Sequence, residues 1–79
     1  MTNVEFRALR SEAGVTQARV AIRADVDRTR LCMWEVGDLG LRAEEVWSLE
    51  KALAGLISER ADQMTKLLTS FESRQVAAG

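Results

Sequence analysis

The segment from Thr16 to Gly37 (TQARVAIRADVDRTRLCMWEVG) limits the possible folds most, because it has room for two short helices and a tight turn. Thr16 is a good N-cap residue, and the helix behind it is predicted to span 17–24. Asp27 caps a second helix, which is predicted to span 28–36. Gly37 then suits the left-handed position that commonly ends a helix. This segment therefore predicts two helices of about two turns each.

Each predicted helix of this segment has one buried face and one exposed face. Leu31 and Trp34 lie three residues apart, so they share one side of the second helix. Ala21 supplies a small residue where two helices cross closely. Asp25 lies in the turn, because aspartate tolerates a positive φ better than most residues. These positions predict a compact pair of crossed helices.

Further helices are predicted on both sides of this segment. Thr2 and Glu5 form a capping box for a helix that runs to about Ala13. A fourth helix begins at Arg42 or Ala43, and Gly55 interrupts its pattern. Apolar residues then recur at spacings of three and four as far as about Arg74, which predicts a fifth, amphipathic helix. We expect a core over 1–54, a C-terminal helix over 55–75 and a frayed tail over 76–79.

Composition supports an all-α chain and argues against catalysis. The 79 residues include no proline and no histidine, and only five glycines. No glycine-rich phosphate loop is present, so we expect neither an enzyme nor a cofactor. The single cysteine, Cys32, cannot form an internal disulfide, and without histidine it cannot build a zinc site. We expect a cytoplasmic protein with no metal, no small-molecule ligand, no secretion signal and no membrane span.

The residues from about Phe6 to Leu53 resemble the DNA-binding domain of Cro and phage-repressor-type regulators, the XRE family. The resemblance depends on a set of positions with the expected relative spacing: Thr16-Gln17, Ala21, Val26, Leu31, Trp34-Glu35 and Gly37. It implies a five-helix lambda-repressor-like helix-turn-helix domain with an extended C-terminal amphipathic helix. In such domains the third helix lies in the major groove of DNA, and the second crosses the backbone.

The resemblance also implies roles for individual side chains. Base contacts fall on Arg28, Thr29 and Met33, and arginine at such a position commonly binds guanine through O6 and N7. Phosphate contacts fall on Gln17, Arg19, Arg30 and Arg42. Arg10 and Glu35 occupy positions where some members of the family have a buried ion pair between the first and third helices. That pair would fix the angle of the recognition helix.

Charge and the loop after Gly37 argue against tight DNA binding. The chain has 11 basic and 12 acidic residues, a net charge of −1. Phosphate contacts supply much of the affinity for DNA, so the positive charge must gather on one face. The loop 38–41 (DLGL) replaces the basic segment that many relatives have, and Val36 replaces a polar residue. Arg42 is the residue that can compensate.

The C-terminal apolar stripe has two interpretations. It either closes the core or forms a self-complementary dimer interface, and we favour the dimer. Six residues are predicted to form that interface: Leu56, Ile57, Met64, Leu67, Leu68 and Phe71. Leu39, Leu41 and Trp47 can contribute to it. A small repressor domain gains affinity for double-stranded DNA by pairing two half-sites.

Three functions remain open at the level of sequence. The first is a homodimeric, sequence-specific transcription regulator, most plausibly a small phage Cro-like repressor. The second is a protein-binding module that retains the fold, such as an anti-repressor or the partner of another regulator. The third is an antitoxin that represses its own operon and so combines both activities.

Overall fold

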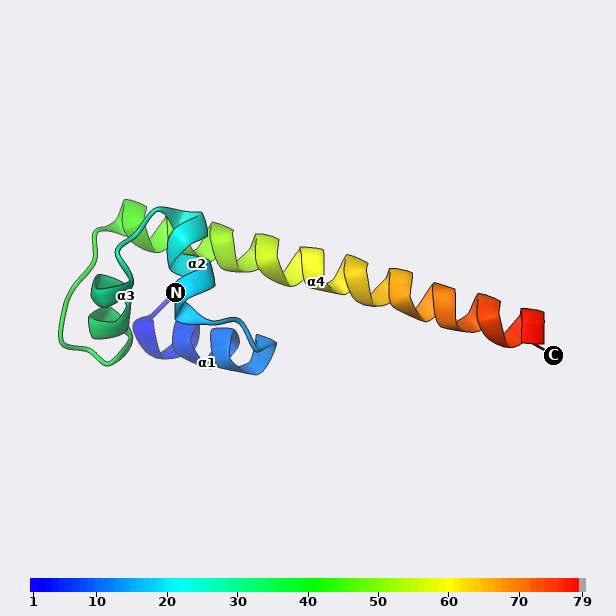
Figure 1. Cartoon of the computed structure of the whole chain (residues 1–79). Helices are drawn as coiled ribbons and strands as arrows, with labels where there is room; N and C mark the ends of the chain where they lie inside the picture. Colours follow the sequence, from blue (N-terminus) through cyan, green and yellow to red (C-terminus); the bar gives the residue numbers. More distant parts are fainter. Residues whose placement is uncertain (79) are drawn as a thin grey trace.

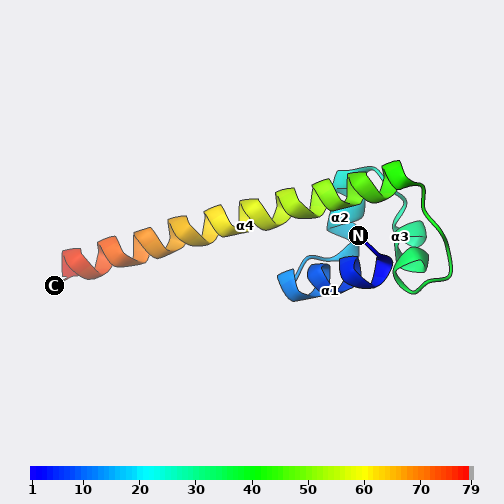
Figure 2. The same cartoon turned by 180° about the vertical axis from the view of Figure 1, so that it is seen from behind.

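The computed structural model describes residues 1–78, with side chains up to Arg74, and these residues form four α-helices and no strand. The helices are α1 (Asn3–Ala13), α2 (Gln17–Ala24), α3 (Arg28–Glu35) and α4 (Ala43–Ala78). The first three helices gather beside the N-terminal part of α4, and the rest of α4 extends away from them (Figures 1 and 2). The chain is therefore a small helical body with one long projecting helix.

Four helices rather than five is a correction to the sequence prediction. The predicted fourth and fifth helices are one continuous helix, α4, with Gly55 in its interior. A glycine there costs about 1 kcal/mol relative to alanine, which is too little to end a helix that packing supports. The glycine instead makes room for Arg23 of α2, because a Cβ at Gly55 would lie 2.8 Å from an Arg23 guanidinium nitrogen. Helical backbone is described through Ala78, and Gly79, the end of the predicted tail 76–79, lies outside the described residues.

The short helices begin at the caps that the sequence predicts. Thr2 and Glu5 form the complete capping box of α1. The hydroxyl of Thr16 accepts a hydrogen bond from the backbone N–H of Arg19 (3.2 Å) at the start of α2. At the other end of α2, Asp25 adopts a left-handed conformation (φ 56°), which turns the chain toward α3. These local interactions set the limits of helices that are too short to be stable alone.

The core takes one fully buried large side chain from each helix: Phe6, Val20, Leu31 and Leu49. Phe6 also meets Trp34 with a distance of 5.4 Å between ring centroids, at a tilted angle of 55°. Leu56 belongs to this core and is only 8% exposed, so little of its side chain is left for the predicted dimer interface. The core ends at Leu56, because the side chains of residues 61–74 are all exposed.

Residues 61–74, called the overhang below, give the molecule its elongated shape. The described chain measures 57 × 19 × 18 Å, and α4 has 36 residues. At 1.5 Å per residue that helix is about 54 Å long, so it alone accounts for the long dimension. No helix among residues 1–78 combines the length and apolar character of a membrane span.

The packing around Phe6 leads to a stability prediction. Phe6→Ala is expected to lower the free energy of unfolding by about 3–5 kcal/mol, because it leaves a cavity where α1 meets Trp34. Val4→Ala on the same helix is the matched control, since Val4 is largely exposed, and it should change stability by less than about 0.5 kcal/mol. Urea unfolding followed by circular dichroism measures both. Equal losses in the two variants would contradict this account of the core.

Candidate nucleic-acid interface

Helices α2 and α3 are joined by the three residues Asp25, Val26 and Asp27. The backbone N–H of Val26 donates to the carbonyl of Ala21 (3.0 Å), which closes the turn. The carboxylate of Asp27 accepts from the backbone N–H groups of Thr29 (2.8 Å) and Arg30 (3.3 Å) at the start of α3. The two helices are therefore held at a fixed angle by short-range hydrogen bonds on both sides of the turn.

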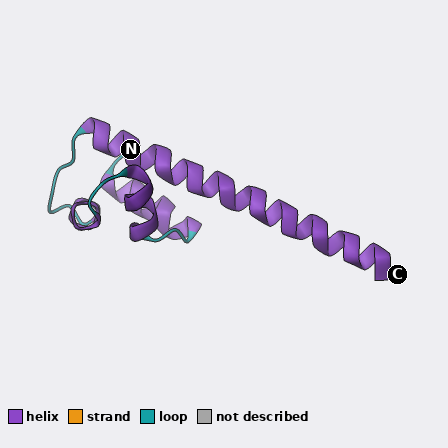
Figure 3. Cartoon of the chain, turned by 45° about the horizontal axis from the view of Figure 1, so that its top comes forward, coloured by secondary structure: helices purple, strands orange, loops and turns teal. Residues whose placement is uncertain are grey.

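Helix α3 lies at the end of the molecule opposite the C-terminus of α4, and Figure 3 views it nearly along its axis. Its inner side buries Leu31, Trp34 and Glu35. Its outer side exposes Arg28, Thr29 and Met33, the three residues predicted to contact bases, together with Cys32. The three predicted base-contact residues therefore lie together on one accessible side of one helix.

A buried ion pair fixes this helix to the rest of the body. Glu35 is only 3% exposed, and both of its carboxylate oxygens accept hydrogen bonds from the Arg10 guanidinium, each at 2.8 Å. The same guanidinium donates to the backbone carbonyl of Val15 (2.9 Å). The pair thus connects α1, the α1–α2 connection and the C-terminal turn of α3. Two parallel hydrogen bonds restrict direction as well as distance, so they fix the orientation of α3.

Gln17 completes this network instead of facing outward alone. Its side-chain amide donates to Glu35 (3.0 Å), so all three helices of the small body meet at one carboxylate. Burial raises the pKa of Glu35, but the hydrogen bonds from Arg10 and Gln17 outweigh that effect and hold the pKa below its usual value. The hydrogen bond to Glu35 likewise raises the pKa of Arg10. The site is therefore charged and fully paired at neutral pH.

The residues predicted to contact phosphates fall into two groups. Arg19 and Arg42 are exposed on the surface. Arg30 is instead paired with Glu45 of α4, whose two carboxylate oxygens accept from one guanidinium nitrogen at 2.9 and 3.0 Å. Gln17 is engaged with Glu35. A phosphate would have to compete with a carboxylate for Arg30 and for Gln17.

Two residues of this surface were missed from the sequence. No local pattern points to Glu45, because its pairing with Arg30 spans 15 positions of the chain. Ile22 is 81% exposed, beside an open hollow of about 550 Å³ between α2 and the start of α3. The helical periodicity of α2 predicts that Ile22 is exposed, because Val20 and Ala21 occupy the inner face.

The loop between α3 and α4 supports the core more than the surface. Leu39 and Leu41 are half-buried, and Leu41 packs against the core, so Leu41 has little apolar surface left for a dimer partner. Trp47 is mostly exposed, with the ammonium group of Lys51 lying 5.0 Å from its ring centre. The apolar character of this loop thus has a structural explanation within one chain.

Comparisons of this chain with protein-family models, with curated proteins and with solved structures give no match. Within residues 1–78 there is also no group of three or more side chains suited to hold a metal ion.

The buried pair predicts an unusual dependence of stability on pH. Glu35 has a lowered pKa in the folded state, so its charge stabilises the fold at neutral pH, and this stabilisation is lost as the pH falls through that lowered pKa. Arg10→Met leaves the buried carboxylate without its cation and should cost about 3–5 kcal/mol at pH 7. The cost should be smaller near pH 3, because loss of the Arg10 hydrogen bonds lets burial raise the pKa of Glu35, and the carboxyl of the variant then takes up a proton as the pH falls. Urea unfolding of both proteins at the two pH values measures the difference, and a cost independent of pH would contradict this role.

Proposed function

We propose that this protein is a sequence-specific, double-stranded DNA-binding transcription regulator of the helix-turn-helix class, a small Cro-like repressor that acts as a homodimer in the cytoplasm. The proposal depends on one observation: α3 exposes its outer side to solvent, while its inner side is held rigidly against the rest of the body. The outer side offers Arg28, Thr29 and Met33 at one surface. The inner side is fixed by the buried Arg10–Glu35 pair.

In the proposed complex α3 enters the major groove, and its outer side chains contact base edges. Arg28 binds guanine, Thr29 hydrogen-bonds a base or touches a thymine methyl, and Met33 adds an apolar contact. Arg19 and Arg42 bind phosphates on either side of the groove. Arg30 joins them when the DNA backbone displaces Glu45. Rigidity matters here, because base contacts discriminate only if the helix does not tilt.

Charge makes the proposed binding weak for a single copy. Two arginines are already paired with carboxylates of α4, Arg30 with Glu45 and Arg23 with Glu59 (2.6 Å). Fewer phosphate contacts mean less of the affinity that does not depend on sequence. Base contacts, which distinguish one DNA sequence from another, then supply a larger share of the total affinity. Two copies on paired half-sites supply the remaining affinity.

A protein-binding role is the second candidate, and one observation favours it. Ile22, Met33 and Val36 are large apolar side chains exposed on α2, on α3 and just after α3. An apolar surface of this kind suits a protein partner better than a phosphate backbone. An antitoxin that represses its own operon would use both surfaces.

The deciding experiment compares binding to DNA from upstream of the gene with binding to a random duplex, at two salt concentrations. Arg28→Ala should cost about 1–3 kcal/mol on the specific site and little on the random duplex. Lys66→Ala is the matched control, because it removes one positive charge from the overhang, far from α3. Binding that does not distinguish the two duplexes at low salt would contradict the proposal and favour the protein-binding role.

The pairing of Arg30 with Glu45 gives a second prediction. Glu45→Gln frees the guanidinium for phosphate, so affinity for every duplex should rise by up to about fivefold, since an exposed ion pair is worth at most about 1 kcal/mol. The salt dependence should become steeper at the same time. Glu44→Gln makes the same change of charge one residue away and serves as the control. If both variants gain equally, net charge rather than the release of Arg30 is responsible.

A further inference from the structure

The overhang has an apolar stripe that nothing in the described chain covers. Met64, Leu67, Leu68 and Phe71 are each more than half exposed, and Ile57 just before them is 39% exposed. Among the described side chains, the last hydrogen bond to the body is made by Arg60, which donates to the carbonyl of Ala13 at the end of α1. Beyond that point a helix of at least 14 residues stands alone, which is marginally stable in water.

The stripe has the spacing of a helix that pairs with another helix. Its members follow one another at intervals of four, three, four and three residues: Ile57, Ala61, Met64, Leu68 and Phe71. This is the heptad spacing that places side chains along one seam between paired helices. Apart from Leu67 beside the seam, the other sides of the helix are polar. Residues 59–74 have three acidic and three basic side chains, a net charge of zero, so two copies do not repel each other overall.

We propose that the overhang pairs with the overhang of a second copy of this chain in an antiparallel arrangement, around a twofold axis at the level of residue 66. In this register Ala61 lies opposite the partner's Phe71, and Met64 lies opposite the partner's Leu68. Each large aromatic residue then meets a small alanine. In a parallel pair, by contrast, the two Phe71 rings would crowd one level and the two Ala61 residues would leave a gap at another.

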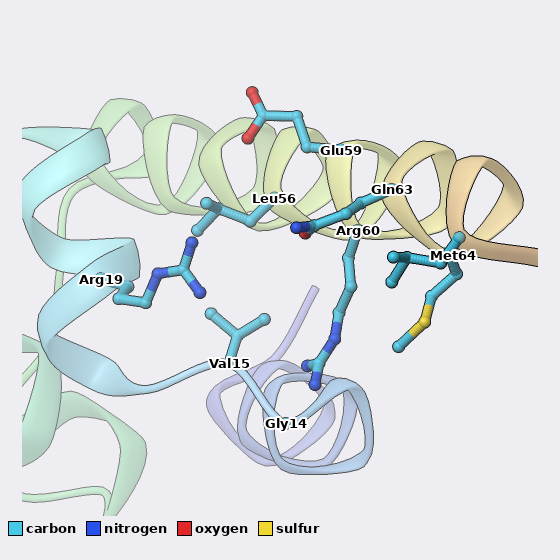
Figure 4. Close-up of a pocket in the computed structure, with 9 residues that line it drawn as sticks. Gly14, Val15, Arg19, Leu56, Glu59, Arg60, Gln63 and Met64 are labelled. Carbon is cyan, nitrogen blue, oxygen red and sulfur yellow. The ribbon is translucent and has the colours of Figure 1, made fainter. Parts of the chain in front are cut away.

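The surface around Ala61 has room for the partner's ring. A hollow of about 240 Å³ lies there between α4 and the end of α1, lined by Ala13, Ile57, Arg60, Ala61 and Met64. Arg60 also borders a neighbouring hollow of about 400 Å³, drawn in Figure 4, where its side chain extends from α4 down to the end of α1 beside Gly14. The smaller hollow, largely apolar and next to the seam, suits an aromatic side chain.

Leu67 gives an independent reason for the antiparallel direction. It flanks the seam, one residue before Leu68, at the heptad position called g. In an antiparallel pair g positions face each other, so Leu67 meets the partner's Leu67 near the twofold axis. In a parallel pair it would face the partner's Glu72 and place an apolar side chain against a carboxylate. The antiparallel arrangement thus uses every large apolar side chain of the overhang.

The contact area approaches the size of a specific interface. The four large apolar side chains of the overhang, each exposing on the order of 100 Å², give roughly 400 Å² of apolar surface per copy. The pair then buries about 800 Å² of apolar surface, and the polar side chains that flank the seam bring the total toward about 1,200 Å², where specific interfaces begin. Burial of this apolar surface favours association and opposes its entropic cost.

Sedimentation equilibrium of the full chain tests the pairing without DNA. The wild type is expected to be a dimer at micromolar concentration. Leu68→Glu should raise the dissociation constant by at least about a hundredfold, because it buries an unpaired carboxylate in the seam. Thr69→Glu is the matched control on the exposed side of the same helix and should leave the dimer intact. Circular dichroism and thermal unfolding show that both variants keep the helical body. A monomeric wild type, or equal effects of the two variants, would overturn the proposal.

Disulfide formation tests the direction of the two helices. Met64→Cys and Leu68→Cys are prepared separately, each with Cys32→Ser, and mixed in equal amounts under mild oxidation. An antiparallel pair places residue 64 of one chain opposite residue 68 of the other, so mass spectrometry should find mainly the mixed disulfide. Each variant linking mainly to itself would indicate a parallel pair and overturn the proposed direction.

Together with the proposed DNA-binding function, on which this step rests, the antiparallel pairing sets the distance between the two α3 helices of the dimer. Helix α3 touches α4 at Glu45, 21 residues before the level of the twofold axis. Each copy has one such contact between α3 and α4, and at 1.5 Å per residue the two contacts are about 60 Å apart along the paired helices. This separation is nearer to the length of two turns of DNA than to the length of one turn. Because the sedimentation and disulfide experiments contain no DNA, a failure of DNA binding leaves the dimer prediction testable by itself.

Discussion

The carboxylate of Glu35 is the point on which the arrangement of the small body depends. It is buried, and its charge is balanced by Arg10 from α1 and further hydrogen-bonded by Gln17 from α2. A buried charge is costly unless it is paired with good geometry, so α1, α2 and α3 have essentially one relative orientation that satisfies it. Apolar packing among Phe6, Leu31 and Trp34 supplies stability, while the ion pair supplies direction.

The two ends of α4 have different roles. Its N-terminal part closes the core through Leu49 and Leu53, and it also pairs Glu45 and Glu59 with arginines of α3 and α2. Those pairs reduce the positive charge that the body presents to a polyanion. In its C-terminal part, every side chain from residue 61 to residue 74 is exposed. In the proposed dimer, the same helix therefore reduces the positive charge that each copy offers to DNA and supplies the surface that pairs with the second copy.

Much of the body was predictable because its signals are local. The caps at Thr2, Thr16 and Asp27 depend on hydrogen bonds that span two or three residues, and the left-handed turn at Asp25 depends on one residue. The Arg10–Glu35 contact was anticipated only through the resemblance to a known family, since 25 positions separate the two residues. Composition, spacing and caps together are sufficient to predict an all-α chain and the outer side of α3.

Local sequence patterns place the first three helices to within about one residue and assign their inward-facing side chains, because periodicity and capping are properties of neighbouring residues. The continuity of α4 through Gly55 follows instead from packing, since the guanidinium of Arg23 fills the space that a side chain would need. The tertiary structure also decided that Leu56 belongs to the core and that Glu45 holds Arg30. Each of these outcomes depends on which elements lie against α4, and contacts between residues distant in the chain leave no pattern in the sequence near either partner.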